Sequence, residues 1–129
     1  INLLEGTIKE MDDERYFTGP GGIRLTFPEE ISSVLDNHID KTVTLGIRPE
    51  SLSHPKAGDR EGVSSMRGNV EIVEPLGAET YVHLSVGETM ISARLAGDQI
   101  PEVNTPYTVD VDTTKIHLFD TDSERAILV

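Results

Sequence analysis

Short segments in which apolar and polar residues alternate recur along this chain of 129 residues, and they restrict it to a β-rich fold. Alternation with a period of two places one face of a strand in a core and the other face in water. The candidate strands centre on residues 4–8, 23–27, 43–47, 70–72, 80–86, 91–95, 107–111 and 126–129. Each segment is short and ends in turn residues, so the sequence predicts an all-β domain with short helices.

One segment, PEEISSVLDNHI (residues 28–39), has apolar residues at helical spacing. Pro28 suits a first helical position, and the two glutamates after it suit the positive end of a helix dipole. Ile31, Val34 and Leu35 would share one face of the helix. Because a helix of this length is marginal alone, we expect it to pack on the strands.

Glycine and proline mark four turns. Gly87 and Glu88 separate two alternating segments and predict a two-residue hairpin turn in which Gly87 has a positive φ. The GPGG stretch at residues 19–22 predicts a second hairpin tip. Pro75 and Gly77 predict a bent corner between two strands. In LGIRPESL, residues 45–52, a strand should pass directly into one helical turn.

The chain divides at residues 53–65, where the apolar period is lost and Pro, Gly, Ser and charged residues predominate. This composition predicts an exposed connection between two halves, residues 1–52 and 66–129. Each half is too poor in strands to be self-sufficient. We expect either one interlocked β unit or two small lobes that share a core.

The charge excludes two classes of partner. The chain carries 23 acidic and 11 basic residues, a net charge of -12, whereas nucleic acids and anionic membranes recruit positively charged surfaces. No apolar run is long enough to span a bilayer, and the first residues lack a signal-peptide pattern. With no cysteine, the composition is compatible with a reducing compartment. We expect a cytoplasmic protein, and Ile1 in place of Met suggests a piece of a longer chain.

Sequence patterns typical of catalysis are missing. The chain has no G-x-x-x-x-G-K-[ST] phosphate loop and no G-x-S-x-G elbow. His38, His54, His83 and His117 never fall in pairs at metal-ligand spacing. The sequence therefore predicts no catalytic, cofactor or metal site.

The densest group of structure-specifying residues is VEIVEPLGAETYVHL, residues 70–84. Glu74, Glu79 and Tyr81 flank its predicted corner. Two interpretations stay open for these side chains: exposed positions on a sheet edge, or an interface or ligand site.

Four segments together resemble a known family. NLLEG, LGIRPESL, VEIVEPLGAETYVHL and KIHLFDTDSERAI match, in this order, the C-terminal regulatory region of MalK-type ATPase subunits of sugar ABC importers. The resemblance covers essentially the whole chain. It implies an OB-like β-barrel of the TOBE (MOP-like) type over residues 1–129, which follows a nucleotide-binding domain. That domain, with its ATP and Mg²⁺, would lie upstream of Ile1, so this fragment should not hydrolyse ATP.

The resemblance also implies a function and partners. Regulatory domains of this family pair across two ATPase subunits and hold them together while the nucleotide-binding domains open and close. The implied partners are a second copy of the subunit, the membrane subunits contacted through the parent chain, and in some members a regulatory protein. The implied location is the cytoplasmic face of the membrane, in an importer of maltose-type oligosaccharides or glycerol phosphate.

Three motifs carry this resemblance onto individual positions. The candidate regulatory or interface residues are Arg48, Pro49 and Glu50 in the first motif, Glu74, Gly77 and Glu79 in the second, and His117, Phe119 and Asp120 in the third. Arg48 and Glu50 could form a charge-assisted contact at the strand-to-helix corner, with Phe119 buried beside it. The motifs serve either the fold or the subunit contact, and Pro and Gly within them favour the fold.

Two other functions remain open at this stage. TOBE-type barrels of related transporters bind small oxyanions such as molybdate, although this chain is strongly acidic. OB folds also bind oligosaccharides, and a sugar sensor would need aromatic stacking platforms, for which Tyr81 and Tyr107 are the main candidates.

Overall fold

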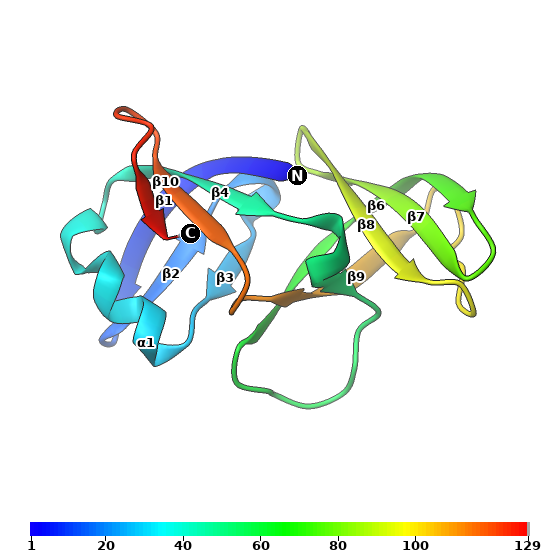
Figure 1. Ribbon diagram of the computed structural model, residues 1–129, viewed down its shortest axis with the longest axis horizontal. Coiled ribbons are helices and arrows are strands. Elements are labelled where there is room, and N and C mark those ends of the chain that lie inside the picture. Colours follow the sequence, from blue (N-terminus) through cyan, green and yellow to red (C-terminus); the bar gives the residue numbers. More distant parts are fainter. Residues whose placement is uncertain (129) are drawn as a thin grey trace.

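The computed structural model describes residues 1–128 as two antiparallel sheets that form two lobes side by side (Figure 1). Sheet A has the order β11-β10-β4-β1-β2-β3, and sheet B has the order β5-β9-β6-β7-β8. The strands of sheet A are β1 (Asn2–Met11), β2 (Glu14–Thr18), β3 (Arg24–Thr26), β4 (Thr42–Ile47), β10 (His117–Asp120) and β11 (Ala126–Leu128). Those of sheet B are β5 (Leu52–Ser53), β6 (Val63–Pro75), β7 (Glu79–Val86), β8 (Thr89–Ala96) and β9 (Pro106–Asp112).

The chain crosses between the lobes twice. It leaves sheet A after β4, passes through the 3₁₀ turn η3 (Pro49–Ser51) and enters sheet B at β5. After β9 it returns through residues 113–116 to add β10 and β11 to sheet A, where β10 pairs with β4. Both ends of the chain therefore build the first lobe, and the two crossovers connect it to the second.

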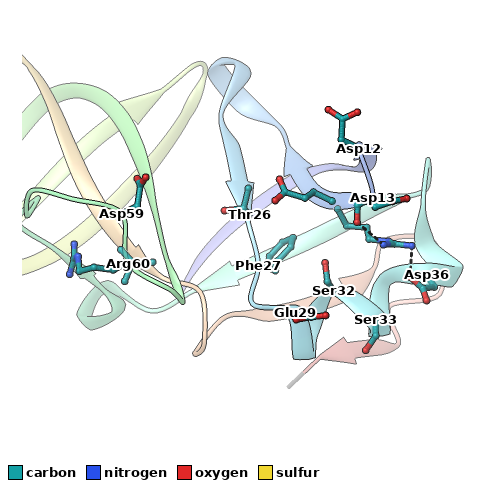
Figure 2. A pocket seen from close by; sticks show the side chains of 13 residues that line it. Asp12, Asp13, Thr26, Phe27, Glu29, Ser32, Ser33, Asp36, Asp59 and Arg60 are labelled. Carbon is teal, nitrogen blue, oxygen red and sulfur yellow. Dashed lines mark hydrogen bonds and ion pairs between the residues drawn. The ribbon is translucent and has the colours of Figure 1, made fainter.

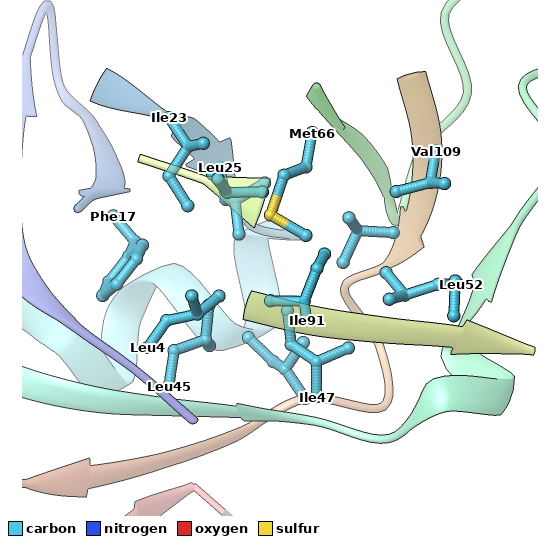
Figure 3. Close-up of a cluster of buried hydrophobic side chains, with 14 of the residues drawn as sticks. Leu4, Phe17, Ile23, Leu25, Leu45, Ile47, Leu52, Met66, Ile91 and Val109 are labelled. Carbon is cyan, nitrogen blue, oxygen red and sulfur yellow. The ribbon is translucent and has the colours of Figure 1, made fainter. Parts of the chain in front are cut away.

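One apolar core runs through both lobes. Its buried members come mainly from strands of both sheets, and Figure 3 shows them meeting between the lobes. Those labelled are Leu4, Phe17, Ile23, Leu25, Leu45, Ile47, Leu52, Met66, Ile91 and Val109. The predicted all-β fold is confirmed, and sheet A curls into the half-barrel expected of an OB-like domain (Figure 1).

The clearest alternating segments form the strands that they predict. In β7 and β8 every second residue is buried, and the two strands pair from Glu79 with Ala96 to Val86 with Thr89. Gly87 begins the two-residue turn between them with a φ of 61°, as the sequence indicates. The GPGG tip is confirmed between β2 and β3, where a 3₁₀ turn η1 (Pro20–Gly22) joins the strands.

The predicted helix is shorter than expected. The α-helix α1 spans Glu29–Ser32, and the chain then continues as the 3₁₀ helix η2 (Ser33–His38). Pro28 lies before the first helical residue, so its predicted position within the helix is wrong. Of the predicted apolar face, Leu35 is buried but Val34 is 43% exposed, so the face is wrong at Val34. The segment SSVLDNH explains the change, because Ser, Asp and Asn side chains compete for backbone hydrogen bonds and favour turns.

A second difference concerns β2, which the sequence did not predict as a strand. Within β2 only Phe17 is buried, so no alternating apolar pattern reveals it. Asp12 and Asp13 form the preceding hairpin turn with positive φ values of 52° and 65°. Aspartate adopts this conformation more readily than most residues, and it is the signal that could have identified the hairpin.

The connection between the halves is shorter and better anchored than expected. Strand β6 begins at Val63, so the predicted exposed segment ends before residue 65. The carboxylate of Asp110 is buried, pairs with Arg60 and accepts a hydrogen bond from the backbone N–H of Lys56 at 3.1 Å. The connection folds back over this carboxylate, which explains its burial.

Candidate functional site

The first and third motifs converge at the crossovers between the lobes. Because β4 and β10 are antiparallel neighbours, His117 lies opposite Gly46, close to the start of η3. A cavity of about 380 Å³ opens here, which we call the corner cavity. Its lining residues are Arg48, Glu50, Ser51, Thr114, Lys115, Ile116 and His117. The predicted passage from strand to helical turn is confirmed, since the N–H of Ser51 donates to the carbonyl of Arg48 at 2.9 Å.

The predicted contact between Arg48 and Glu50 is not formed. Both side chains are exposed, and no carboxylate of the described chain lies within ion-pair distance of Arg48. Phe119 lines a different cavity instead of burying beside this corner. The reason is the strand alternation of β10, which sends its odd-numbered residues to the outer face of sheet A.

The second motif forms the predicted corner but lies apart from the other two motifs. The N–H of Leu76 donates to the carbonyl of Glu79 at 2.8 Å, and Gly77 has a φ of 88°, which favours glycine. Glu79 pairs with Arg94 at 2.8 Å on an exposed surface. None of these residues lines the corner cavity. The motif therefore specifies a turn of sheet B in this structure.

A chain of side-chain hydrogen bonds starts at the second motif and ends in sheet A. Glu74 bonds to Nε2 of His83 at 2.7 Å, and Nδ1 of His83 bonds to the hydroxyl of Ser92 at 2.8 Å. The amide of Asn2 then pairs with the backbone N–H and carbonyl of Ser92 at 2.7 and 2.9 Å. The arrangement ties the first strand to sheet B.

An apolar surface surrounds Phe119 on the outer face of sheet A. A cavity of about 500 Å³ is lined by Ile1, Leu3, Thr44, Phe119, Asp120, Thr121 and Glu124, and we call this surface the Phe119 patch. Ile1 is 66% exposed and Leu3 is 56% exposed. The hydroxyls of Thr44 and Thr121 bond to each other at 3.0 Å. Sequence analysis missed this patch, although adjacent Leu3 and Leu4 indicate that one leucine of a strand faces outward.

Asp120 has a structural role at the edge of the Phe119 patch. Its carboxylate accepts a hydrogen bond from the backbone N–H of Ser123 at 2.9 Å, and this bond lowers the pKa of the carboxyl. The backbone N–H groups of Asp120 and Glu124 close the same turn through bonds to Arg125 and Asp120. Asp120 thus fixes the turn that leads into β11.

A cavity of about 830 Å³ forms an acidic groove between the β1–β2 turn, α1 and the connection at residues 59–63 (Figure 2). Arg15 pairs with Asp36 at 2.9 Å and with Glu10 at 3.0 Å. Arg60 pairs with Asp110. Within residues 1–128 no three acidic or histidine side chains gather closely enough to hold a metal ion. Arg15 and Arg60, the two arginines that line the groove, are therefore both paired with carboxylates of the chain.

Two tyrosine side chains make contacts within the chain. The hydroxyl of Tyr107 bonds to Nδ1 of His54, and the two rings meet edge to face with centroids 6.0 Å apart. Burial raises the pKa of Tyr107. Tyr16 is covered by the guanidinium of Arg24 at 4.0 Å from the ring centroid.

In the part of the chain that the structure describes, no helix has the length and apolar character needed to cross a bilayer.

Two family models match the chain in succession. The MalK OB fold domain matches residues 1–52, and the TOBE domain matches residues 45–119. The two matches overlap at LGIRPESL, where the chain crosses from sheet A to sheet B.

Several curated relatives are ABC transporter ATP-binding proteins. The sulfoquinovosyl glycerol transport ATP-binding protein SmoE of Agrobacterium fabrum is 40% identical over 67% of this chain and 23% of its own length. YurJ of Bacillus subtilis, described as an uncharacterized ABC transporter ATP-binding protein, is 30% identical over 98% of this chain and 35% of its own length. The sn-glycerol-3-phosphate import ATP-binding protein UgpC of Salmonella typhimurium is 30% identical over 98% of this chain and 33% of its own length. The chain therefore spans at most about a third of these relatives.

A solved structure supports the fold. The cytoplasmic molybdate-binding protein ModG superposes with a TM-score of 0.67 over 91% of this chain and 94% of its own, at 17% sequence identity. At this identity the likeness concerns the fold alone. Because the TOBE model matches more than half of the residues and the MalK OB model precedes it, the chain belongs to the MalK-type OB-fold and TOBE domain family of ABC transporter ATP-binding proteins.

Proposed function

We propose that this chain is the regulatory and dimerisation region of the ATPase subunit of an ABC importer for sugars or glycerol derivatives. In this role it holds two subunits together on the cytoplasmic face of the membrane while ATP is hydrolysed elsewhere in the parent protein. Support comes from the family assignment and from relatives named for sulfoquinovosyl glycerol transport and sn-glycerol-3-phosphate import. The membrane subunits and any regulatory protein would be reached through the parent chain.

The Phe119 patch is the observation that carries the dimerisation role. Two copies of a chain with a net charge of -12 repel each other, so a stable contact has to use a surface poor in carboxylates. Ile1, Leu3 and Phe119 supply the apolar part of such a surface, and Asp120 and Glu124 are the two carboxylates that line it. In a two-fold dimer the same patch faces itself, and burying apolar side chains there would offset the charge repulsion.

Sedimentation velocity over a range of protein concentrations tests this role. We expect the chain to dimerise reversibly, and Leu3→Asp to raise the dimer dissociation constant by about 100-fold, because like charges meet across the two-fold axis. Met90→Asp is the matched control, since Met90 is 52% exposed on β8 of the other lobe. It should add the same charge without weakening the dimer.

Two results would argue against the proposed contact. One is a chain that stays monomeric at the highest concentration, with no difference between wild type and either variant. The other is equal weakening by Leu3→Asp and Met90→Asp, which would attribute the effect to total charge instead of to the patch.

A further inference from the structure

Two apolar residues of the Phe119 patch lie on either side of an inward-facing asparagine. Ile1 and Leu3 are exposed, whereas Asn2 between them is only 8% exposed, because successive residues of an extended chain point to opposite faces. The side chain of Ile1 lies over Gly46 of β4, where an added Cβ atom would be 3.1 Å from its Cδ1. The position of Asn2 therefore determines how Ile1 and Leu3 lie on the outer face of sheet A.

Asn2 is held by an edge strand of the other sheet. β8 is the last strand of sheet B, so the N–H and C=O groups along its outer edge have no neighbouring strand. The side-chain amide of Asn2 replaces such a neighbour at one residue. Its Nδ2–H donates to the carbonyl of Ser92 at 2.9 Å, and the N–H of Ser92 donates to its Oδ1 at 2.7 Å. We call this pair of hydrogen bonds the Asn2–Ser92 clamp.

The chemistry of the clamp requires an amide on one side and only backbone on the other. An amide both donates and accepts, whereas a carboxylate could accept from the N–H of Ser92 but not donate to its carbonyl. An apolar side chain would leave both groups of Ser92 without a partner in a partly buried position, which is costly. The hydroxyl of Ser92 bonds to His83 instead and takes no part in the clamp.

The clamp is also the polar link between the first strand and the second lobe. Within residues 1–128, no other hydrogen bond joins β1 to sheet B, because the backbone of β1 pairs with β2 and β4 of its own sheet. Two apolar residues that line the patch on the first lobe are thus adjacent to a residue that the second lobe holds.

We propose that sheet B controls the Phe119 patch through the Asn2–Ser92 clamp, which holds Ile1 and Leu3 in the orientation that a second copy meets. Residues that are ordered before contact cost less to bind than residues that the contact itself has to order. A movement of the second lobe that separates β8 from β1 would release these residues and weaken the contact. The inference rests on the dimerisation role proposed above and adds Asn2 as a residue that positions the patch without lining it.

Hydrogen–deuterium exchange tests the clamp in the monomer, at a protein concentration below the dimer dissociation constant. We expect Asn2→Leu, which removes both hydrogen bonds with a side chain of similar size, to speed exchange in the peptide of residues 1–11 by about tenfold. Asn2→Asp keeps only the acceptor for the N–H of Ser92 and should cause a smaller increase. Ser92→Ala is the matched control, since it keeps both backbone groups and should leave this exchange unchanged.

Sedimentation velocity of the same variants tests the link to the patch. Asn2→Leu should raise the dimer dissociation constant by about tenfold, because the second copy then has to order Ile1 and Leu3 itself. Ser92→Ala should leave the constant unchanged. Neither substitution alters the net charge, so charge repulsion between the copies is the same in all three proteins.

Each outcome decides for or against the proposal. Faster exchange and a weaker dimer for Asn2→Leu, with neither for Ser92→Ala, support it. Equal exchange in wild type and Asn2→Leu would overturn the clamp, and faster exchange with an unchanged dissociation constant would overturn its role in the patch. A wild type that stays monomeric would refute the dimerisation role, and exchange alone would then decide whether sheet B positions Ile1 and Leu3.

The peptide of β9, residues 106–112, is the internal reference for global stability. A variant that unfolds as a whole would exchange faster in β9 as well. Faster exchange confined to residues 1–11 therefore separates release of the clamp from misfolding.

Discussion

Phe17→Ala is expected to lower the free energy of unfolding by about 3–5 kcal/mol, the range for removing a buried phenylalanine. Phe17 has no exposed surface, although the strand that carries it shows no apolar alternation in sequence. Its ring packs against Gly6 of the neighbouring strand β1, so truncation leaves a cavity in the core of the first lobe. Urea denaturation followed by circular dichroism measures the change.

Ile72→Ala is the control for this experiment. Ile72 lies in a strand, β6, but its side chain is 50% exposed because the pairing of β6 with β7 shifts between Val70 and Ile72. Its free energy of unfolding should fall by less than about 1 kcal/mol. A loss at Phe17 no larger than the loss at Ile72 would mean that the first lobe does not pack as described.

Gly6→Ala is expected to lower the free energy of unfolding by about 3 kcal/mol, at the upper end of the range for overpacking. A Cβ atom on Gly6 would lie 2.3 Å from the backbone oxygen of Thr18 and 2.5 Å from Cζ of Phe17. The first contact is with backbone, which cannot move aside without separating β1 from β2. Thermal and urea unfolding of the variant measure the loss.

Gly46→Ala provides a matched comparison on the adjacent strand β4. The nearest atom to its added Cβ is the flexible end of Ile1, at 3.1 Å, and His117 Cβ follows at 3.4 Å. We expect a change of less than about 1 kcal/mol. If the two glycine variants were equally unstable, close approach of β1 to β2 would not be the cause.

The elements that were predicted best from the sequence are strands that pair with the next strand along the chain. β7 and β8 follow each other along the chain and are joined by a two-residue turn, so alternation and Gly87 together determine them. Burial of Asp110 could not be predicted, because it depends on Arg60 and Lys56 from a connection 50 or more positions earlier in the chain. Contacts between residues so far apart in the chain leave no local pattern in the sequence.

The same distinction applies to the candidate sites. The motifs at Arg48 and His117 were identified separately, but their convergence depends on the pairing of β4 with β10, which spacing does not reveal. The exposed position of Leu3 follows from alternation within β1, whereas its proximity to Phe119 depends on the order of strands in sheet A. The alternation of apolar and polar residues within a strand thus indicates on which face of the sheet a side chain lies, whereas the pairing of strands determines which residues that side chain contacts.

Site-specific cross-linking tests the central claim, that a second copy docks on the Phe119 patch. The chain has no cysteine, so a single introduced thiol reports one position. Leu3→Cys and Met90→Cys place thiols at similarly exposed sites, 56% and 52%, on opposite lobes. With a short bismaleimide, we predict a covalent dimer of Leu3→Cys and a monomer of Met90→Cys at the same protein concentration. A covalent dimer of Met90→Cys but not of Leu3→Cys, or none of either, would contradict the account.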